Sequence, residues 1–511
     1  MNTLRALIVG VSNYDRIHQI NLPFCINDIS AMREALVSGL NFNKLNIITC
    51  GENGIVTEIE FLTALKQMTS IADSNDTLVF YFSGHGGTSQ SSHHLLLSDS
   101  YINTQVIIEY LEKIPAKNKI IFIDSCMSGD FNVSQTASYN INEAIKDFLG
   151  RGYAVFASSR DNQYSYGHPE KPLSLFTSFL CEVLQDVYLI QKGKKSLDDI
   201  KKLLFVYLDV WNKRNPERQQ QPIYRANMGG TIFFDVQEYH PFHVAQIYEE
   251  TDNYVIYSVK PLHHGLAKRY AVKVILKRPF SFEEISVINH EIVKKAKTFD
   301  IYENEITEKH WRGKDANLVF CYYGRDESDI VNGNYLCDTT WVDDAQDKAW
   351  WYRVEGSSSI INNVYVHFHS YYESLKIFNT NNCGTKDNLI NESKIILVQL
   401  VTLAEQVIAL YNEFLNKSKD EKMLVNELDN IIPVIERLFL EETNLSIPPI
   451  ELHEWSQRCS YLAGTIYDLT LFYNKKNLES RTYENRMQCM NLKIRSYYED
   501  LEELKKVEEN I

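Results

Sequence analysis

Two short segments of the 511-residue chain contain the residue types that nucleophilic catalysis requires. One is residues 83–86, Ser-Gly-His-Gly, and the other is residues 124–126, Asp-Ser-Cys. A cysteine thiolate is a strong nucleophile, and a nearby imidazole can generate it or protonate its leaving group. Taken alone, His85 is more often a structural residue and Cys126 a small buried apolar one. Their shared position after strand-like runs is what predicts a catalytic pair.

The elements that precede these segments must bring His85 and Cys126 together. Residues 78–82 and 120–123 are apolar runs with the length of buried strands. Similar runs alternate with helical patterns through residues 1–236, which predicts an α/β fold with a mostly parallel sheet flanked by helices. Functional groups in such sheets gather at the carboxyl ends of the strands. We therefore expect both segments at one end of the sheet.

The periodicity of apolar residues divides the chain into three predicted domains: residues 1–236, an α+β domain at 240–385 and a C-terminal helical bundle at 386–511. In the first we expect strands at 4–9, 45–49, 77–83, 119–123, 153–157 and 231–234, and helices at 26–40, 57–70, 104–114, 142–150, 175–189 and 197–213. In the others we expect strands at 254–259 and 270–276, and helices at 395–415, 423–440, 452–473 and 483–507, with Pro433 kinking or splitting the second helix.

Composition restricts the classes of function. With 44% hydrophobic and 23% charged residues, the chain has the balance of a soluble globular protein. No apolar run approaches the ~18 residues of a membrane-spanning helix, and we expect no signal peptide, hence a cytoplasmic protein without membrane partners. The net charge of −15 argues against binding a nucleic-acid polymer. Residues 1–236 hold 21 basic and 24 acidic residues, a balance of −3, which leaves −12 for the rest. Nine dispersed cysteines without a Cys-x-x-Cys pattern indicate free thiols.

The His and Cys segments resemble the corresponding blocks of the caspase-like clan of cysteine peptidases, most closely those of metacaspases and bacterial caspase-like proteins. Residues 24–28, Phe-Cys-Ile-Asn-Asp, resemble the metacaspase Gly-Cys-x-Asn-Asp segment, with Phe24 in place of the glycine. Further blocks at 6–10, at 157–159 with 174–177, and at 221–222 with 229–234 follow in the family's order. The resemblance covers about residues 4–236 and implies a caspase-like fold there. We know of no such resemblance for residues 240–511.

The resemblance implies a mechanism residue by residue. Cys126 would attack the scissile carbonyl, and His85 would protonate the leaving amine and help activate water. The backbone N–H groups of Gly86 and Cys126 would form the oxyanion hole. The family has no obligatory third catalytic residue, and none is assigned here. Met127 stands where the family often has histidine, which should leave the nucleophile intact.

The resemblance also implies a substrate pocket. The metacaspase pocket positions correspond to Cys25, Asp28, Ser83 and Asp124, and the residue types agree. Two desolvated carboxylates suit an Arg or Lys side chain at P1, the substrate residue before the scissile bond. The alternative is that Asp28 caps the helix it sits on and that Asp124 holds its own turn by hydrogen bonds. Because Asp124 lies so close to the nucleophile, we favour the pocket for it and leave Asp28 open.

Two corollaries follow from the same comparison. The aspartate cluster with which some metacaspases bind calcium cannot be reconstructed, because Asp99 and Asp130 are nearby but the family's spacing is missing. We therefore expect neither a metal nor a cofactor. If P1 is basic, Lys146, Arg151 and residues 194–195 become candidates for self-cleavage, although solvated surface explains them equally well.

The second half contains one local basic stretch. Residues 253–282 hold Lys268, Arg269 and Lys273 among other cations, several tyrosines and no acidic residue. Such a mixture could bind a nucleotide-type messenger, with cations for phosphate and aromatic faces for a base. The favoured alternative is an amphipathic β-hairpin with a solvated basic face. By analogy, bacterial caspase-like proteases with an extra domain await a signal, such as a messenger or an activating protein.

We therefore expect a cysteine endopeptidase that cleaves after Arg or Lys and is regulated by its C-terminal region in signalling, antiviral defence or regulated cell death. One rival is a non-catalytic caspase-like scaffold, against which the intact His85, Gly86 and Cys126 argue. Another is a free-standing peptidase in which residues 240–511 contribute only stability. The substrates, the signal and the oligomeric state do not follow from the sequence.

Overall fold

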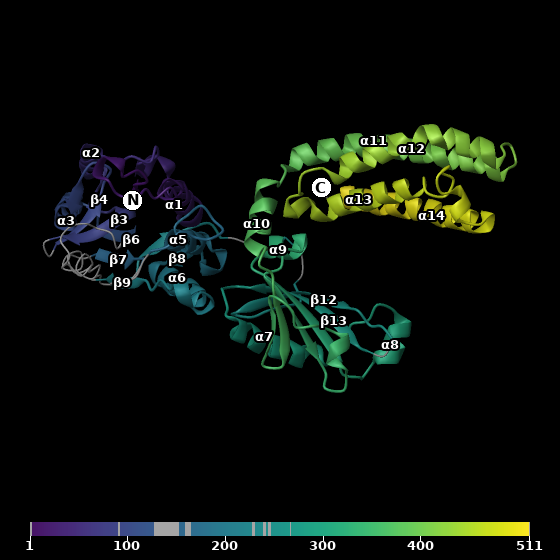
Figure 1. Cartoon of the computed structure of the whole chain (residues 1–511), viewed down its shortest axis with the longest axis horizontal. Coiled ribbons are helices and arrows are strands. Elements are labelled where there is room, and N and C mark those ends of the chain that lie inside the picture. The colour runs from purple at the N-terminus through teal and green to yellow at the C-terminus, as the bar shows by residue number, and fades with distance from the viewer. Residues whose placement is uncertain are drawn as a thin grey trace. The chain divides into compact units, whose positions relative to one another are not determined.

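The structure is a computed structural model that describes residues 3–89, 92–126, 153–158, 165–226, 230–238, 242–243, 247–265, 267–509 and 511, with the backbone alone at 88, 89, 92 and 126 (Figure 1). By its contacts the chain divides into two compact units. The first comprises Met1–Asp326 and Leu336–Phe368, and the second comprises Glu327–Tyr335 and His369–Ile511. The predicted helix at 142–150 lies outside the described residues. The predicted domain boundaries at 236–240 and 385–386 stay predictions.

The first sheet of unit 1 is mostly parallel, as predicted. Its strand order is β2-β1-β3-β6-β7-β9. Its members are β1 (Leu4–Gly10), β2 (Ile47–Cys50), β3 (Thr77–Ser89), β6 (Asn118–Cys126), β7 (Tyr153–Ala157) and β9 (Ile223–Ala226). Only β9 runs antiparallel to its neighbour in this path. Strands β4 (Ser92–Leu96) and β5 (Tyr101–Asn103), which the sequence pattern did not predict, extend β3 as an antiparallel hairpin.

Helices cover both faces of this sheet because the strand residues alternate between two apolar cores. In β1, Leu7 and Val9 belong to one core, and Ala6 and Ile8 to the other. The first core includes residues of α2 (Glu58–Ile71) and α3 (Thr104–Lys113), and the second includes residues of α1 (Cys25–Leu40), α5 (Leu175–Gln185) and α6 (Leu197–Arg214). The Thr57 side chain caps α2 by accepting from the Glu60 N–H group.

The strand predicted at 231–234 is present, but it lies outside the main sheet. Residues 233–235 form β10 (Phe233–Asp235), which pairs with β8 (Lys194–Ser196) in a separate two-stranded sheet. The edge of the main sheet is instead β9, which pairs with β7. The Phe234 side chain still reaches the core on the α1, α5 and α6 side. The apolar pattern at 231–234 therefore predicted a strand with buried residues, but it did not indicate which strand pairs with it.

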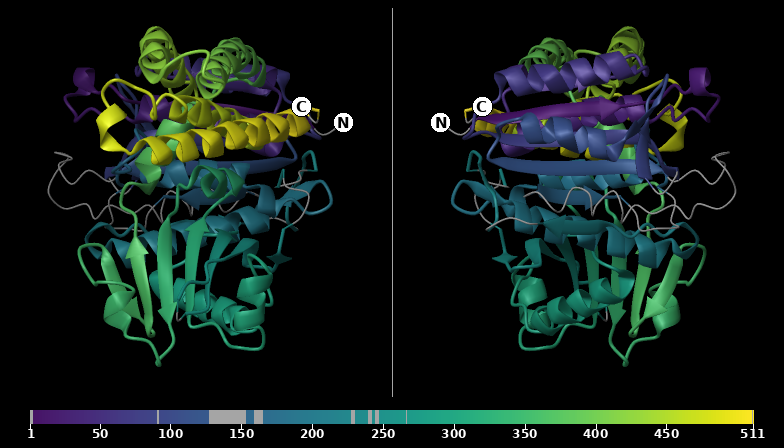
Figure 2. Two further views of the ribbon diagram at one scale, coloured as in Figure 1. Left: turned by 90° about the vertical axis from the view of Figure 1, so that its right-hand side faces the viewer. Right: turned by 90° about the vertical axis from the view of Figure 1, so that its left-hand side faces the viewer.

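Unit 1 contains a second sheet of seven strands in the order β11-β12-β13-β14-β15-β17-β16. They are β11 (Glu249–Glu250), β12 (Tyr254–Pro261), β13 (Arg269–Leu276), β14 (Leu318–Gly324), β15 (Cys337–Val342), β16 (Ser358–Ile361) and β17 (Val364–Phe368). The predicted strands at 254–259 and 270–276 are the antiparallel pair β12 and β13. Helix α7 (Phe282–Ala296), which begins with a Ser281–Glu284 capping box, packs on one face of the sheet (Figure 2). Helix α8 (Glu305–Trp311) follows before β14.

Unit 2 is helical, as predicted for the C-terminal region. Four long helices form it, α11 (Lys386–Leu415), α12 (Glu421–Thr443), α13 (His453–Asp468) and α14 (Tyr483–Glu508), with the shorter α9 (Glu327–Asn332) and α10 (Tyr372–Asn381) (Figure 1). Their shared core includes Leu400, Leu428, Leu462 and Tyr497. Pro433 lies inside α12 and does not split it.

Helix α11 departs from the expectation that no segment is apolar enough to span a membrane. Its length and composition would allow it to cross one, with a mean hydropathy of 1.6 over its most apolar window. The helix also supplies buried residues such as Leu400, Val407 and Tyr411 to the core of the bundle. Its apolar residues form no uninterrupted run, because polar residues such as Gln399, Thr402 and Glu405 lie between them.

Candidate active site

The backbones of His85 and Cys126 lie directly opposite each other at the carboxyl ends of two neighbouring strands. Strands β3 and β6 pair in parallel with Ser83 opposite Asp124, Gly84 opposite Ser125 and His85 opposite Cys126. Neighbouring strands of a sheet are about 4.8 Å apart. The sheet therefore brings the two predicted catalytic positions together. The side chain of Cys126 lies outside the described part of the chain.

The imidazole of His85 is held in one orientation and one tautomer. It is 2% exposed, and its Nε2 lies 2.7 Å from the main-chain oxygen of Ile20. A carbonyl oxygen can only accept, so Nε2 carries the hydrogen and Nδ1 of the neutral ring is the acceptor. The ring also packs against Tyr14, with centroids 4.6 Å apart.

The electrostatics of His85 favour the neutral ring. Burial lowers the pKa of His85, and the hydrogen bond to Ile20 only partly opposes that effect. Its Nδ1 is buried and has no hydrogen-bond partner among the described residues. A neutral imidazole with an available lone pair can take a proton from a thiol and return it to a leaving amine.

Two residues that position His85 were not found by sequence analysis. The Tyr14 hydroxyl accepts a hydrogen bond of 2.8 Å from the His85 N–H group, and Ile20 supplies the carbonyl for Nε2. Both lie between β1 and α1. Ile20 acts through its main chain, so its side chain gives no signal. Gly84 leaves room for the Tyr14 side chain, because a Cβ at that position would lie 2.5 Å from the Tyr14 hydroxyl.

Gly86 of β3 is closely packed against the neighbouring strand β6. A Cβ at this position would lie 3.0 Å from the Ser125 Oγ and 3.1 Å from the Ser125 Cβ. The backbone there pairs with Leu95 of β4. Glycine therefore allows β3 and β6 to approach each other beside the predicted nucleophile. The oxyanion-hole role of Gly86 and Cys126 stays a prediction.

Asp28 is buried and joins three segments of the chain. Its carboxylate accepts from the Ser83 hydroxyl at 2.7 Å, from the Ser174 N–H group at 2.9 Å and from the Ser174 hydroxyl. The alternative that Asp28 caps its own helix is wrong. The capping position of α1 is Phe24, and no side chain caps there. Asp28 lies one turn inside the helix and faces the sheet end.

Asp124 is also buried and also binds distant segments. One oxygen accepts from the Ser165 hydroxyl at 2.8 Å, and the other accepts from the Thr177 hydroxyl at 2.7 Å and the Thr177 N–H group at 3.2 Å. These hydrogen bonds connect Asp124 to residues 41 and 53 positions away and not to its own turn, contrary to the alternative. Thr177 lies in the first turn of α5, where backbone N–H groups favour a negative charge.

The two carboxyl groups interact with each other electrostatically. Burial, followed by the charge of Asp124, raises the pKa of Asp28 to about 7. Burial also raises the pKa of Asp124. Within the described ranges neither carboxylate forms an ion pair. The site thus contains a buried acidic pair, and the donors to it among the described residues are hydroxyl and backbone N–H groups.

Of the four predicted pocket residues, the structure links three directly. Ser83 donates to Asp28 and lies opposite Asp124 in the sheet. Cys25 begins α1, three residues before Asp28, and is buried. Residues three apart share a helix face. All four lie around the carboxyl ends of β3 and β6.

The predicted ligand-binding residues in β13 and just before it do not act alike. Lys268 is buried, and its ammonium group donates to the main-chain oxygens of Phe299 at 3.1 Å and Lys314 at 2.8 Å. Burial lowers its pKa. Lys268 therefore stabilises the fold and does not fit a ligand-binding role. Arg269 and Lys273 are half-buried and lie on one face of β13, since their positions differ by an even number.

The structure also places several residues of the two corollaries. Lys195 is buried and donates to the Leu184 oxygen at 2.7 Å, whereas Lys194 is exposed and 3.6 Å from an Asp235 oxygen. Lys194 is thus the accessible member of the pair for self-cleavage. Asp99 accepts from the Glu58 N–H group at the start of α2, which explains it structurally. Lys146, Arg151 and Asp130 lie outside the described residues.

Comparison with known proteins finds similarity in the N-terminal part of the chain. Residues 3–233 match the family model described as "Caspase domain", which confirms the resemblance. Metacaspase-1 of Scheffersomyces stipitis is 37% identical over 89 residues, 16% of this chain and 22% of that protein. Metacaspase-1 of Schizosaccharomyces pombe is 30% identical over 88 residues, 16% of this chain and 20% of that protein. The chain thus covers about a fifth of the length of these relatives.

Among solved structures, caspase-1 from Spodoptera frugiperda aligns with 46% of this chain and 93% of its own, at 14% sequence identity and a TM-score of 0.35.

Proposed function

We propose that the caspase-like domain formed by residues 3–233, a domain of a cysteine-peptidase family, is an active endopeptidase that cleaves after Arg or Lys. The observation that carries the proposal is the placement of His85. Its Nε2 is bound to Ile20, its Nδ1 is available, and its backbone is directly opposite Cys126. A decayed scaffold would have no need to keep a buried imidazole in this tautomer.

The thiols elsewhere in the domain favour Cys126 as the nucleophile. Burial raises the pKa of Cys50 to about 12 and raises the pKa of Cys181 as well. A raised pKa keeps a thiol protonated and therefore unreactive. Cys126, in contrast, lies directly opposite the positioned imidazole of His85 in the sheet register. Among the described strand residues, no other cysteine is paired with His85.

The acidic pair supports basic P1 specificity. Asp28 and Asp124 raise the energy of each other's charged form, and a guanidinium or ammonium group entering between them would relieve that repulsion. An acidic P1 side chain would add a third negative charge to the site. The same pair could instead serve only to bind α1 and α5 to the sheet end, so specificity must be measured.

The test is a peptide-library cleavage profile of the full-length protein with matched variants. We expect cleavage after Arg and Lys by the wild type and by Cys383→Ala, which removes an exposed thiol. We expect a loss of several orders of magnitude in Cys126→Ala and His85→Ala. Normal turnover by Cys126→Ala would refute the enzyme, and a profile dominated by acidic P1 residues would refute only the specificity.

We further propose that the region beyond residue 240 regulates this peptidase in the cytoplasm, in a signalling or antiviral pathway that leads to cell death. The signal would be a nucleotide-type messenger or an activating protein. Arg269 and Lys273 support this, because they place two cations on one face of β13. Regulation requires two arrangements of the chain, one of which the signal binds better.

The regulatory proposal has its own test. Activity of the full-length protein is measured with and without extract of infected cells, for the wild type and for a variant with Arg269→Glu and Lys273→Glu. We expect a response that the charge reversal abolishes while basal activity persists. The regulatory proposal would fail if the wild type were fully active without extract and the charge-reversed variant behaved in the same way. The region beyond residue 240 would then have only a structural role.

A further inference from the structure

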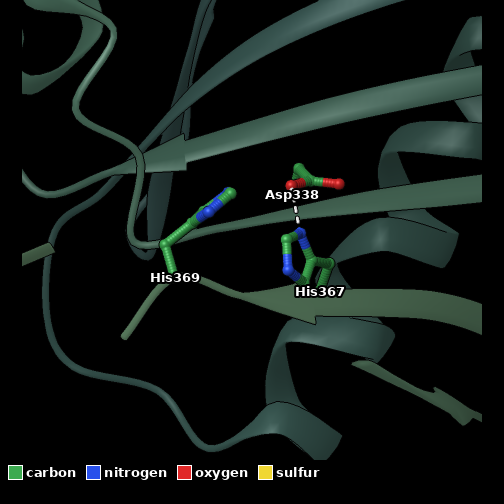
Figure 3. A group of neighbouring side chains, drawn as sticks. All are labelled: Asp338, His367 and His369. Atoms are coloured by element: carbon green, nitrogen blue, oxygen red, sulfur yellow. Dashed lines mark hydrogen bonds and ion pairs between the residues drawn. The ribbon is translucent and has the colours of Figure 1, made fainter. Parts of the chain in front are cut away.

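A buried glutamine, Gln220, forms hydrogen bonds that sheet pairing does not explain. Where two polar residues face each other across a sheet, the register accounts for their contact. Asp338 of β15 and His367 of β17 are an example, with their Oδ1 and Nδ1 atoms 3.3 Å apart (Figure 3). Gln220 lies outside the strands, between α6 and β9, and is 0% exposed. Burying an amide costs free energy unless its hydrogen bonds are replaced, so the partners of Gln220 show what it holds in place.

The hydrogen-bond partners of Gln220 come from three segments of the chain. Its side-chain oxygen accepts from the Tyr166 N–H group at 3.2 Å. Its side-chain nitrogen donates to the main-chain oxygen of Ser158 at 3.0 Å and to the Ser165 hydroxyl at 3.3 Å. Its main chain forms two bonds with the Asn212 side chain, at 2.7 and 3.0 Å. The side chain therefore holds the segment before α5 against the residue that follows β7, and the main chain is fixed to α6.

These partners determine which way the amide of Gln220 points. In the reversed orientation its hydrogens would face the Tyr166 N–H group and its oxygen would face the Ser158 oxygen, so both bonds would be lost. The nitrogen therefore faces Ser165. Because an amide nitrogen can only donate, the Ser165 oxygen accepts there, and the single hydrogen of that hydroxyl goes to Asp124 Oδ1 at 2.8 Å. A chain of hydrogen bonds thus runs from Gln220 through Ser165 to Asp124.

This chain acts on one oxygen of the Asp124 carboxylate. Oδ1 accepts from Ser165, whereas Oδ2 accepts from the hydroxyl and the N–H group of Thr177. Burial raises the pKa of Asp124, and the hydrogen bonds from Thr177 and Ser165 act in the opposite direction because they stabilise the charged carboxylate. Bonds in such a chain polarise one another, so the bond that Gln220 gives to Ser165 strengthens the one that Ser165 gives to Asp124.

We propose that Gln220 is a positioning residue for the pocket that binds the P1 side chain. It acts through Ser165, whose hydroxyl it fixes as a donor to Asp124, and so keeps that carboxylate turned and charged for an arginine or lysine side chain. The proposal rests on the function proposed above for the acidic pair. The preference for a charged P1 side chain would then depend on a residue in the loop before β9, far from Asp124 in the sequence.

The alternative is that Gln220 only joins α6, the end of β7 and the segment before α5. Its bonds with Asn212 and with the Ser158 oxygen fit that interpretation. Loss of the amide would then lower the stability of the protein without changing which P1 side chain it prefers. The two interpretations therefore differ in how well the protein distinguishes a charged P1 side chain from an uncharged one of the same shape.

The experiment measures by calorimetry how tightly the full-length protein binds two peptides that differ only at P1. One has arginine there, and the other has citrulline, its uncharged isostere. Every protein carries Cys126→Ala, so that the peptides are not cleaved. We expect this background protein to bind the arginine peptide more tightly. Gln220→Met, which keeps the approximate shape of the side chain without its amide, should reduce this preference about tenfold, the effect of one hydrogen bond to a charged group.

Two further variants separate the pocket from the fold. Ser165→Ala removes the hydroxyl but leaves the other side-chain bonds of Gln220. It should reduce the preference as much as Gln220→Met does, and the double variant should reduce it no further, because both changes act through one bond to Asp124. Asn212→Ala removes the bonds to the Gln220 main chain, so it should lower the unfolding temperature and keep the preference of the background protein.

The outcomes distinguish this role from the peptidase activity itself. An arginine preference that is the same in Gln220→Met as in Asn212→Ala, or that Ser165→Ala does not reduce, would overturn the proposal. No preference in the background protein would refute both the basic P1 pocket and the role of Gln220. The peptidase activity is tested separately, by cleavage of the arginine peptide with Cys126 intact. Absence of cleavage, together with a preference that Gln220 controls, would refute the enzyme and support the pocket.

Discussion

Ser83 of β3 donates a hydrogen bond of 2.7 Å to Asp28, which lies 55 residues earlier on α1. The bond is buried, and it connects the strand that positions His85 to the helix that covers this side of the sheet. The same carboxylate accepts from Ser174, just before α5. Asp28 therefore belongs to the structural frame of the site as well as to its predicted pocket.

The first prediction concerns pH and stability. Because the pKa of Asp28 rises from 3.8 to about 7 on folding, the folded state binds a proton that the unfolded state releases. The free energy of unfolding should therefore fall as the pH rises between these values, by on the order of 4 kcal/mol from this group. The free energy of unfolding, measured by urea unfolding at several pH values in this range, should depend less on pH for Asp28→Asn than for the wild type.

Asp76 provides a control of opposite sign. Burial acts to raise the pKa of Asp76, but the hydrogen bonds from Arg5 and the Asp73 N–H group outweigh it and lower the pKa. Its contribution to stability is thus present above the unfolded pKa and lost as the pH falls. Asp76→Asn should remove stability mainly at higher pH. An identical pH slope in the wild type and Asp28→Asn would contradict the first prediction.

The second prediction concerns pH and substrate binding. Asp28 is uncharged below its pKa of about 7, so the acidic pair carries more negative charge above that pH. We expect the KM for a peptide with Arg at P1 to decrease as the pH rises through 7. Asp28→Asn should remove this dependence from KM. A wild-type KM that stays constant as the pH rises through 7 would show that the charge of Asp28 does not contribute to substrate binding.

The third prediction concerns Tyr14. Tyr14→Phe removes the hydroxyl that accepts the His85 N–H group and leaves that buried donor unpaired. The free energy of unfolding should fall by about 1–3 kcal/mol. Because the lost hydroxyl fixes the backbone of His85 while the ring contact with the imidazole is retained, kcat should fall and KM should change little. Tyr461→Phe, at an exposed position of α13, is the matched control, and equal kcat in both variants would exclude a positioning role.

The fourth prediction concerns Gly86. A methyl group there would lie 3.0 Å from the Ser125 Oγ, so Gly86→Ala should push β3 and β6 apart beside Cys126. We expect a loss of activity together with a destabilisation of about 1–3 kcal/mol. Gly464→Ala in α13 meets no atom within 4 Å and should be neutral or slightly stabilising. Thermal unfolding and peptide cleavage of both variants measure the difference.

The fifth prediction separates the two roles of the basic stretch. Lys268→Ala leaves the carbonyls of Phe299 and Lys314 without their buried donor, which should cost about 1–3 kcal/mol. Lys273→Ala should lower the free energy of unfolding by much less, because the Lys273 side chain is only half-buried whereas that of Lys268 is buried. Urea unfolding of the two variants decides this. A Lys268→Ala protein as stable as the wild type would contradict the structural role of Lys268.

The sequence predicted the parts of the fold that depend on local patterns. The apolar runs before His85 and Cys126 became the parallel pair β3 and β6, because burial on both faces requires continuous apolar strands. Pairing across long distances was harder to predict. The run at 231–234 indicated a strand, but its partner became β8 in a separate sheet.

The site showed the same limits. His85 could be found because its neighbours are glycines, whereas Ile20 contributes only a main-chain oxygen, which any residue type carries. Lys268 looked like a ligand-binding cation because a sequence pattern does not reveal that its ammonium group points inward. The hydrogen bonds of Asp28 to Ser174 join residues 146 positions apart and have no local signature.

Under the proposed function, the register between β3 and β6 would make peptidase activity a measure of strand alignment. If β6 slipped by one residue, Asp124 would turn to the other face of the sheet and lose Thr177, and Cys126 would no longer lie opposite His85. Misaligned molecules could keep nearly the same secondary structure and compactness. Titration of active sites in a preparation would count only the correctly aligned chains, which circular dichroism cannot do.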